Sequence, residues 1–262
     1  MPIVTSLSAR GVLTLTLNRP EKHNALNAEL LETLHAALLD ARLDERVRVI
    51  VLTGAGASFC AGADIEYMRS MRELSEEENL GDARLLARCL RTLDEIDRPL
   101  IVRVNGNAFG GGIGLIACAD VAIGVETAKL AFSEARLGIV PATISPYVVR
   151  AIGPRQARRL FVTALPFDAH EAQHIGLLHR TVAPADIDGE VERHIEAVLA
   201  CGPLAVREAK QLVRKLETEH DRDALQEETA QLLAKLRMSD EGQEGLSAFL
   251  EKRRPRWLIR DA

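Results

Sequence analysis

Two glycine-containing segments and one acidic residue have the residue types and the spacing that suit chemistry at a carbonyl group. Residues 58–65 and 104–114 lie about fifty positions apart, and Glu134 follows the second segment. Small side chains leave backbone N–H groups uncovered, and two N–H groups that converge on one point form an oxyanion hole. A carboxyl group near that point would transfer protons. The combination predicts a reaction beside a carbonyl whose oxygen gains negative charge.

The glycine run also has a purely structural interpretation, because close packing of a helix on a strand requires small residues. A buried helix that begins at Gly111 would nevertheless direct free N–H groups and its positive dipole end outward. The turn formed by Ala61, Gly62 and Ala63 offers a second donor. The sequence leaves open whether the two donors converge.

The elements that must position these residues follow from periodicity. Alternating apolar residues predict a half-buried strand over Val12–Leu17, and Asn27 is suited to cap a helix that follows it. A polar and mobile stretch is expected around residues 75–78. The other expected elements are strands at 47–53, 100–104 and 121–125, and helices at 73–93, 113–117, 154–163 and 169–175. This alternation predicts an α/β core with crossover connections.

The character of the chain changes from Pro203 onward, where apolar residues recur at helical spacing with charges between them. We therefore divide the chain into a core at residues 1–199 and a helical C-terminal region at residues 200–262. Amphipathic helices of this kind need a partner surface, either the core or another subunit.

Composition excludes several classes of function. The formal net charge of −5 gives no general attraction to nucleic acid or to an anionic membrane. No secretory signal and no membrane-spanning apolar run is visible in the sequence. Four isolated cysteines without zinc spacing indicate reduced residues and a cytoplasmic protein. A basic run at residues 252–256 is equally compatible with a solvated helix end and with a phosphate contact.

Two short motifs suggest other chemistries. Residues 112–117 fit the dinucleotide fingerprint G-x-G-x-x-A, but residues 105–111 intervene after the strand and make the turn too long. His170, Glu171 and His174 match the zinc signature H-E-x-x-H on a very short helix. We expect those histidines on a solvent face and no metal site. Arg103 and Arg136 would serve either as ion-pair partners or as contacts to a substrate carboxylate.

Taken together, these segments resemble the crotonase, or enoyl-CoA hydratase/isomerase, superfamily over essentially the whole chain. The matching segments are Asn18-Arg19-Pro20, residues 24–27, 59–65, 104–106, 110–112 and 133–141, Gly176-Leu177, and residues 242–245 and 249–253. The resemblance implies an α/β fold made of a spiral of ββα turns, with a helical C-terminal region used in trimer formation. Homotrimers or homohexamers are the expected assemblies.

The resemblance also implies roles for individual positions. Ala63 and Gly111 correspond to the oxyanion-hole donors, and Glu134 corresponds to a catalytic acid. The positions implied in binding the substrate and its coenzyme A part are Lys22, Ala25, Ala61, Asp64, Ile65 and Gly114, with Phe249 and Lys252 reaching the coenzyme A of a neighbouring subunit. No metal and no cofactor apart from coenzyme A in the substrate is implied.

The chain departs from the usual hydratase pattern at Gly114, where typical hydratases carry a second glutamate beside the substrate. A single acid is also found in some enoyl-CoA isomerases and in hydratases with unusual substrates. Within the superfamily the chain is most similar to hydratases of methylglutaconyl-CoA and isohexenylglutaconyl-CoA, which act in leucine and acyclic terpene breakdown.

The resemblance therefore predicts an enoyl-CoA hydratase, in which Glu134 activates water and has a raised pKa. Either the same carboxyl or a water in the space left at Gly114 would return the proton. The alternatives are a Δ3-Δ2 enoyl-CoA isomerase, a non-catalytic acyl-CoA-binding protein and a nicotinamide oxidoreductase. We expect the wall of the acyl pocket to come from residues 68–90.

Overall fold

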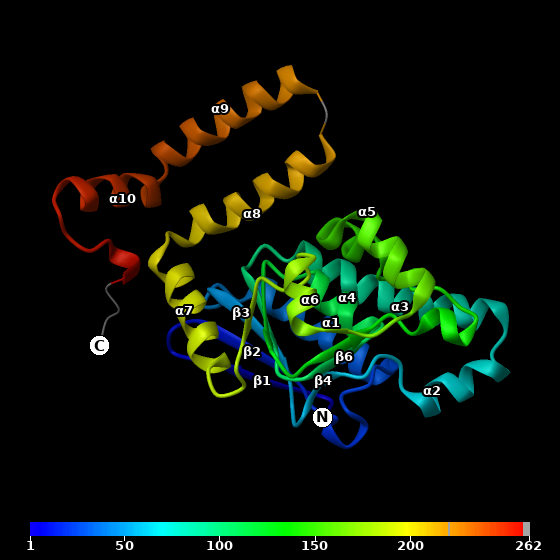
Figure 1. The fold of residues 1–262 in the computed structure, drawn as a ribbon. Coiled ribbons are helices and arrows are strands. Elements are labelled where there is room, and N and C mark those ends of the chain that lie inside the picture. The colour runs from blue at the N-terminus through cyan, green and yellow to red at the C-terminus, as the bar shows by residue number, and fades with distance from the viewer. Residues whose placement is uncertain (220, 259–262) are drawn as a thin grey trace.

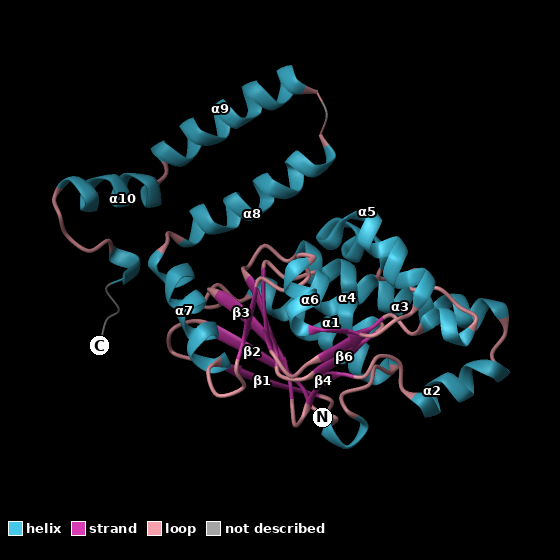
Figure 2. Cartoon of the chain, viewed as in Figure 1, coloured by secondary structure: helices cyan, strands magenta, loops and turns pink. Residues whose placement is uncertain are grey.

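Two β-sheets and ten α-helices make up the part of the chain described by this computed structural model, which is residues 1–219 and 221–258 (Figures 1 and 2). The larger sheet has the strand order β1 (Ile3–Leu7), β2 (Val12–Leu17), β3 (Val49–Gly54), β5 (Leu100–Val104), β7 (Val121–Val125) and β10 (Arg180–Val182). The smaller sheet has the order β4 (Ser58–Cys60), β6 (Asn107–Phe109), β8 (Lys129–Ala131) and β9 (Phe167–Asp168). Neighbouring strands run parallel except in the pairs β1–β2 and β8–β9.

The helices connect these strands in a repeating order. They are α1 (Ala28–Leu43), α2 (Ile65–Ser70), α3 (Glu76–Glu95), α4 (Gly111–Ala117), α5 (Ser145–Thr163), α6 (Ala169–His174), α7 (Ile187–Ala200), α8 (Pro203–Thr218), α9 (Arg222–Met238) and α10 (Asp240–Leu250). In three successive repeats along the chain, one strand belongs to the larger sheet, the next strand belongs to the smaller sheet, and one or two helices follow. This order, β3–β4–α2/α3, β5–β6–α4 and β7–β8–α5, is the spiral of ββα turns that the resemblance implied.

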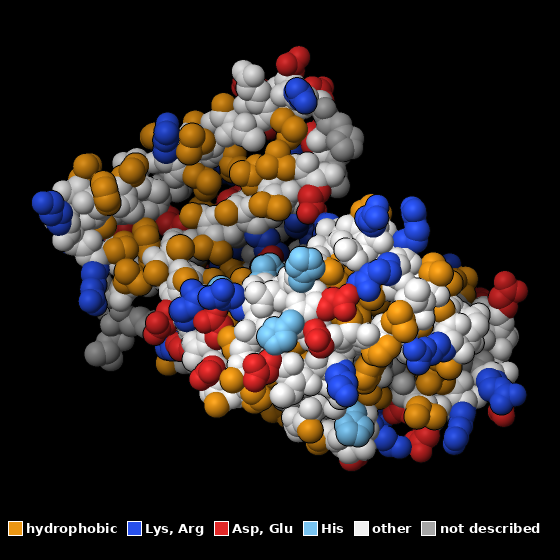
Figure 3. All heavy atoms as spheres, viewed as in Figure 1, with side chains coloured by type: hydrophobic (Ala, Val, Ile, Leu, Met, Phe, Trp, Pro, Cys, Tyr) orange, Lys and Arg blue, Asp and Glu red, His pale blue; other side chains and the backbone are white. Residues whose placement is uncertain are grey.

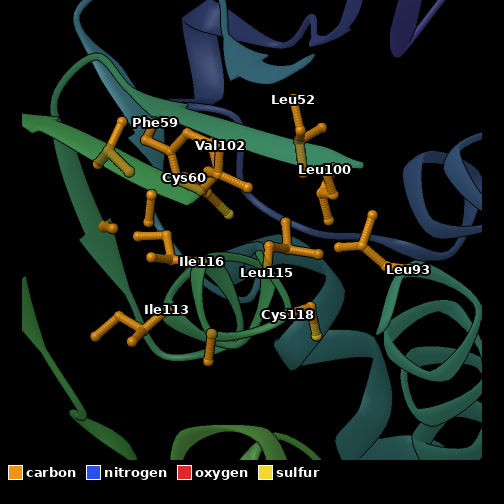
Figure 4. Close-up of a cluster of buried hydrophobic side chains, with 14 of the residues drawn as sticks. Leu52, Phe59, Cys60, Leu93, Leu100, Val102, Ile113, Leu115, Ile116 and Cys118 are labelled. Atoms are coloured by element: carbon orange, nitrogen blue, oxygen red, sulfur yellow. The ribbon is translucent and has the colours of Figure 1, made fainter. Parts of the chain in front are cut away.

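The hydrophobic core lies where helix α4 packs on strands β4 and β6 (Figure 4). Ile113, Leu115 and Ile116 of α4 are almost completely buried, together with Phe59 and Cys60. An apolar helix of this kind is stable only inside the protein, because it has no polar face to present to water. Its first residue, Gly111, is therefore held in a fixed position by the surrounding core.

Most elements predicted from periodicity are present, with shifts at their ends. Asn27 caps α1, since its Oδ1 accepts the N–H of Leu30 at 3.0 Å. The strand expected at 47–53 is observed at Val49–Gly54. The polar stretch at residues 75–78 starts α3, because Ser75 and Glu78 form a capping box there, and its expected mobility stays a prediction.

Helix α5 begins nine residues before the helix predicted at 154–163. Its two halves meet at Gly153, whose φ of 73° breaks the helical path, and Pro154 starts the second half. The sequence prediction identified only that second half, because Gly153 and Pro154 look like a helix start when they are read alone.

Helices α8, α9 and α10 extend away from the rest of the molecule (Figure 1). Four ion pairs among the described residues join α8 to the core: Lys210 to Asp120 at 2.7 Å, Arg214 to Asp94 at 3.2 Å and to Glu95 at 3.5 Å, and Glu217 to Arg150 at 3.6 Å. The proposed division at residues 199/200 stays a prediction, and residues 220 and 259–262 of the C-terminal region lie outside the described residues. In the described part of the chain, no helix is both long enough and apolar enough to cross a membrane.

Candidate active site

The first predicted oxyanion donor, the N–H of Ala63, belongs to a short parallel bridge between two loops. The N–H of Leu26 donates to the carbonyl of Gly62 at 2.7 Å, and the N–H of Asp64 donates to the carbonyl of Leu26 at 2.9 Å. In a parallel bridge of this pattern the central residue directs its own N–H to the opposite side. The N–H of Ala63 is therefore turned away from Leu26, and no partner for it is found among the described residues.

The second predicted donor, the N–H of Gly111, is the first N–H of helix α4. The residue before it, Gly110, has a φ of 46° and donates its own N–H to Ala131 at 3.0 Å. Because the first N–H groups of a helix have no partner within the helix, the Gly111 N–H is free to bind a ligand. The positive φ and the close approach at Gly110 explain why the chain has glycine there.

Glu134 starts a short 3-10 helix, Glu134–Leu137, directly beside Gly110. A Cβ atom on Gly110 would lie only 2.7 Å from its Oε1. Its Oε2 is buried and has no hydrogen-bond partner in the described part of the chain. Burial raises the pKa of Glu134, while a hydrogen bond from its own backbone N–H acts in the opposite direction. The expected raised pKa is confirmed.

These three groups line one cavity of about 310 Å³. Its wall is mostly apolar, as is typical of small-molecule sites. Met68, Asp82 and Leu86 contribute to it and lie within the stretch 68–90 that was expected to form the acyl pocket. Further lining residues come from the loop before α5, among them Leu137, Ile139, Val140, Pro141, Thr143 and Ile144. Two free N–H groups and an unpaired carboxyl thus share one apolar cavity.

Arg19 and Asn24 hold the loop that presents Ala63, a role that the sequence did not reveal. The Arg19 guanidinium donates to the carbonyl of Ala25 at 2.6 Å and to the carboxylate of Asp64 at 2.7 Å. The buried Asn24 side chain donates to the carbonyls of Ala55 and Ser58, both at 2.8 Å. Fixed hydrogen bonds of this kind keep an oxyanion donor in place before the substrate arrives.

The free space that was expected beside Gly114, where typical hydratases carry a second glutamate, is filled by other side chains. A Cβ atom on Gly114 would lie 2.3 Å from Cγ2 of Ile144 and 3.4 Å from Cδ2 of Leu90. Ile144 therefore occupies the place next to Gly114, and the expectation of a water lodged there was wrong. Gly114 is buried and is absent from the described lining of the cavity, so its place among the substrate-binding residues is also not supported by the geometry.

The positions implied in coenzyme A binding differ in how accessible they are. Ala61 and Ile65 line the cavity, and Lys22 pairs with the exposed Glu66 at 3.1 Å. Asp64 is buried, and its carboxylate caps α2 by accepting the N–H of Glu66 at 2.8 Å.

The carbonyl oxygen of Ala25 already accepts a hydrogen bond from the Arg19 guanidinium. Phe249 and Lys252 lie at the end of α10, on the extended C-terminal arm, and Phe249 is 80% exposed. Contact of these two residues with a neighbouring subunit stays a prediction.

The competing motifs have structural roles. His170 and His174 are exposed on α6 while Ala169 and Ala172 are buried, and no metal-binding group of three or more ligands occurs among the described residues. In the fingerprint-like segment, Gly112 packs against Cys60, because a Cβ atom there would lie 2.8 Å from its Cβ. Arg103 pairs with Asp188 at 2.7 Å and is thus an ion-pair partner.

Three cysteines are buried, as expected, but Cys201 is exposed.

The cavity wall contains a hydrogen-bonded pair, Tyr67 and Asp82, that the sequence prediction missed, although Asp82 lies within the expected stretch 68–90. Tyr67 lies on α2 and Asp82 on α3, and the tyrosine hydroxyl donates to the aspartate carboxylate. In the sequence they are two ordinary residues fifteen positions apart, and only the packing of α2 beside α3 brings them together. Burial, the bond to Asp82 and the charges of Asp82 and Glu32 raise the pKa of Tyr67.

Comparison with known proteins agrees with this geometry. The family model described as enoyl-CoA hydratase/isomerase matches residues 8–260. The chain is 36% identical to 2,3-dehydroadipyl-CoA hydratase from Escherichia coli, over 93% of this chain and 94% of that protein. It is 34% identical to crotonyl-CoA hydratase from Syntrophomonas wolfei, over 93% of each. The crystal structure of an enoyl-CoA hydratase from Shewanella pealeana is similar, with a TM-score of 0.94, 38% identity and coverage of 98% of this chain and 96% of that one.

The chain therefore belongs to the enoyl-CoA hydratase/isomerase family and has the α/β crotonase fold with a helical C-terminal region.

Proposed function

We propose that this protein is an enoyl-CoA hydratase that adds water across the 2,3 double bond of an acyl-CoA thioester. The observation that carries the proposal is the buried Oε2 of Glu134, which has no hydrogen-bond partner in the described part of the chain and lies beside Gly110, in the same cavity wall as the N–H groups of Ala63 and Gly111. In this proposal the thioester oxygen accepts both N–H groups. Each such donor typically contributes about 3–4 kcal/mol to stabilising the negative charge of the transition state.

Glu134 carries out both proton transfers in the proposed reaction. Its carboxylate takes a proton from water while the water oxygen bonds to C3 of the acyl chain, and the electrons of the double bond move toward the thioester oxygen. The resulting carboxylic acid then returns the proton to C2, which restores the thioester. Ile144 supports this single-acid mechanism, because it fills the place beside Gly114 where a second acid would stand.

The proposal involves no metal and no cofactor other than the coenzyme A of the substrate. Lys22, Ala61 and Ile65 are the best placed of the expected coenzyme A contacts, since Ala61 and Ile65 line the cavity and Lys22 pairs with Glu66, the residue after Ile65. We further propose a trimer or hexamer in which Phe249 and Lys252 of one subunit reach the coenzyme A of the next.

The acyl group in this proposal is short or branched and fits a mostly apolar cavity of about 310 Å³. The resemblance to hydratases of glutaconyl-type substrates points to a second carboxylate on the acyl chain, whereas the apolar wall favours an uncharged one.

A Δ3-Δ2 enoyl-CoA isomerase is the second candidate, because the single acid favours it as much as it favours hydration. An isomerase needs only one carboxyl that moves a proton between C4 and C2, and it consumes no water. The purified protein should be mixed separately with a 2-enoyl-CoA and a 3-enoyl-CoA of equal length. Loss of the conjugated-thioester absorbance with formation of the 3-hydroxy product supports the hydratase, whereas appearance of that absorbance from the 3-enoyl substrate supports the isomerase.

A non-catalytic acyl-CoA-binding protein would give neither change while still binding the ligand. Calorimetric titration with the saturated acyl-CoA, run beside the two turnover assays, identifies this outcome and would contradict both catalytic proposals.

A further inference from the structure

Tyr67 and Asp82 place an uncompensated negative charge in the wall of the candidate active-site cavity. The Asp82 carboxylate accepts the Tyr67 hydroxyl, which is the only hydrogen bond recorded for it among the described residues. Both side chains are partly buried and line the cavity. A carboxylate in this position attracts cations and hydrogen-bond donors and repels other carboxylates.

The rest of the described cavity wall does not neutralise this charge. It contains Glu134 as a second acid and no lysine, arginine or histidine. The nearby Glu32 is a further acid whose charge acts on Tyr67. A carboxylate on the far end of a bound acyl chain would therefore leave water without gaining a positive partner, which is unfavourable in a mostly apolar cavity.

We infer that Asp82, held in place by Tyr67, is a specificity-determining residue that excludes acyl chains with a terminal carboxylate and selects uncharged acyl-CoA substrates. The inference rests on the proposed function of the cavity as an acyl-CoA site. It distinguishes between the two relatives reported above, since the name of one specifies a dicarboxylic acyl group and the name of the other an uncharged one. It also argues against the glutaconyl-type substrate that the resemblance to glutaconyl-type hydratases suggested.

The matched substrates for the test are 2-pentenoyl-CoA and glutaconyl-CoA, which have the same chain length and differ in a terminal methyl or carboxylate group. Like-charge contacts at a binding site cost enough to give a preference of about 100-fold in kcat/KM for 2-pentenoyl-CoA. The preference should weaken as ionic strength rises, because salt screens the repulsion. Equal turnover of the two substrates would overturn the inference while leaving the hydratase proposal intact.

Asp82→Asn is the central variant, because asparagine keeps the shape and an oxygen that can accept the Tyr67 hydroxyl. We expect it to raise the ratio of kcat/KM for glutaconyl-CoA over 2-pentenoyl-CoA about tenfold, a modest factor because Asp82 is partly exposed to solvent. Glu77→Gln is the matched control, since it removes one charge from the same helix at an exposed position outside the cavity. An unchanged ratio in Asp82→Asn, or an equal change in Glu77→Gln, would overturn the inference.

Binding of saturated ligands tests the charge effect without any turnover. Pentanoyl-CoA and glutaryl-CoA form the matched pair, and calorimetry should show tighter binding of pentanoyl-CoA to the wild-type protein and a smaller difference in Asp82→Asn. If no enoyl-CoA is hydrated but this difference is found, the proposed function fails and the inference about the cavity stands. Equal dissociation constants for the two ligands would overturn the inference whatever the activity.

Discussion

At the scale of single residues, Glu134 is the group on which the proposed chemistry depends. We expect Glu134→Gln to lower kcat by about 10²–10⁴-fold, which is the range typical of lost general acid–base catalysis. The amide cannot take a proton from water, although it fills the same volume. Steady-state hydration of 2-pentenoyl-CoA measures the effect. Glu126→Gln is the control, because Glu126 is exposed and outside the described cavity wall, and equal losses in both variants would contradict the assigned role.

The raised pKa of Glu134 predicts two opposite effects of pH. Activity should rise with pH through that pKa, above the ordinary value of 4.5, because the carboxylate is the base. Stability should change in the other direction. A carboxyl whose pKa is higher in the folded state contributes stability below its unfolded pKa, and that contribution is lost as the pH rises through the folded pKa.

Glu134→Gln removes this ionisation, so we expect the variant to gain in Tm relative to wild type at pH 7. The gain should shrink as the pH falls toward 4, where the wild-type carboxyl becomes protonated. Thermal unfolding of both proteins between pH 4 and 7 measures this. A gain that grows toward low pH would mean that the buried carboxyl is not destabilising when ionised.

Some residues of the site could be predicted from the sequence and others could not. Glu134 and Gly111 were predicted because their local segments resemble a family pattern. The hydrogen bond between Tyr67 and Asp82 was missed because it depends on a contact between two helices, which no local spacing encodes. The filling of the site beside Gly114 by Ile144 was missed for the same reason, since the two residues lie thirty positions apart.

At the scale of elements, the packing of α4 against the start of α5 fills the place beside Gly114 with Ile144. We expect Gly114→Ala to destabilise the protein by about 1–3 kcal/mol, because its new methyl group would collide with Ile144. Ile144→Ala alone should cost about 2–5 kcal/mol through the cavity that it leaves.

The double variant tests whether these two effects share one contact. Ile144→Ala removes the nearest colliding atom and Gly114→Ala fills part of the cavity, so the double variant should lose less free energy of unfolding than the two single losses added together. Urea unfolding of the wild type and the three variants gives the coupling. Additive losses would mean that the two residues are not in direct contact.

Periodicity predicted the long elements and failed for the short ones. Helix α1 and strand β2 were found because each repeats its apolar residues over several helix turns or several alternations, and strand β5 was found as a short apolar run. Strands β4, β6 and β8 have only three residues each, which is too short for alternation to be recognised. The smaller sheet, which carries both loops with oxyanion donors, was therefore predictable only through the resemblance.

At the scale of the whole molecule, the C-terminal arm exposes a large amount of apolar surface. Hydrophobic side chains gather along α8, α9 and α10 (Figure 3). Met238, Phe249 and Leu250 are each more than three quarters exposed, with values of 77%, 80% and 78%. Apolar surface of this extent is typical of protein–protein interfaces.

We therefore expect the protein to be an oligomer in solution, and we expect Phe249→Glu with Leu250→Glu to shift it toward monomer. A buried charge without a partner would destabilise the interface. Sedimentation equilibrium over a range of concentrations measures the assembly. Glu251→Lys, which alters an already exposed charge beside the same site, is the control. A wild-type protein that is monomeric at every concentration would contradict the prediction.

The ion pairs that fasten α8 to the core have a consequence for any attempt to shorten this chain. Asp94 closes α3, and Asp120, just after α4, accepts Lys210 and the N–H of Leu100. Cutting after α7 would take away Lys210 and Arg214, so Asp120 would lose the lysine that it now pairs with, while Asp94 would keep Arg150. A trimmed protein should therefore respond more strongly to salt near its reaction centre, even though the deleted helices never touch the described cavity wall.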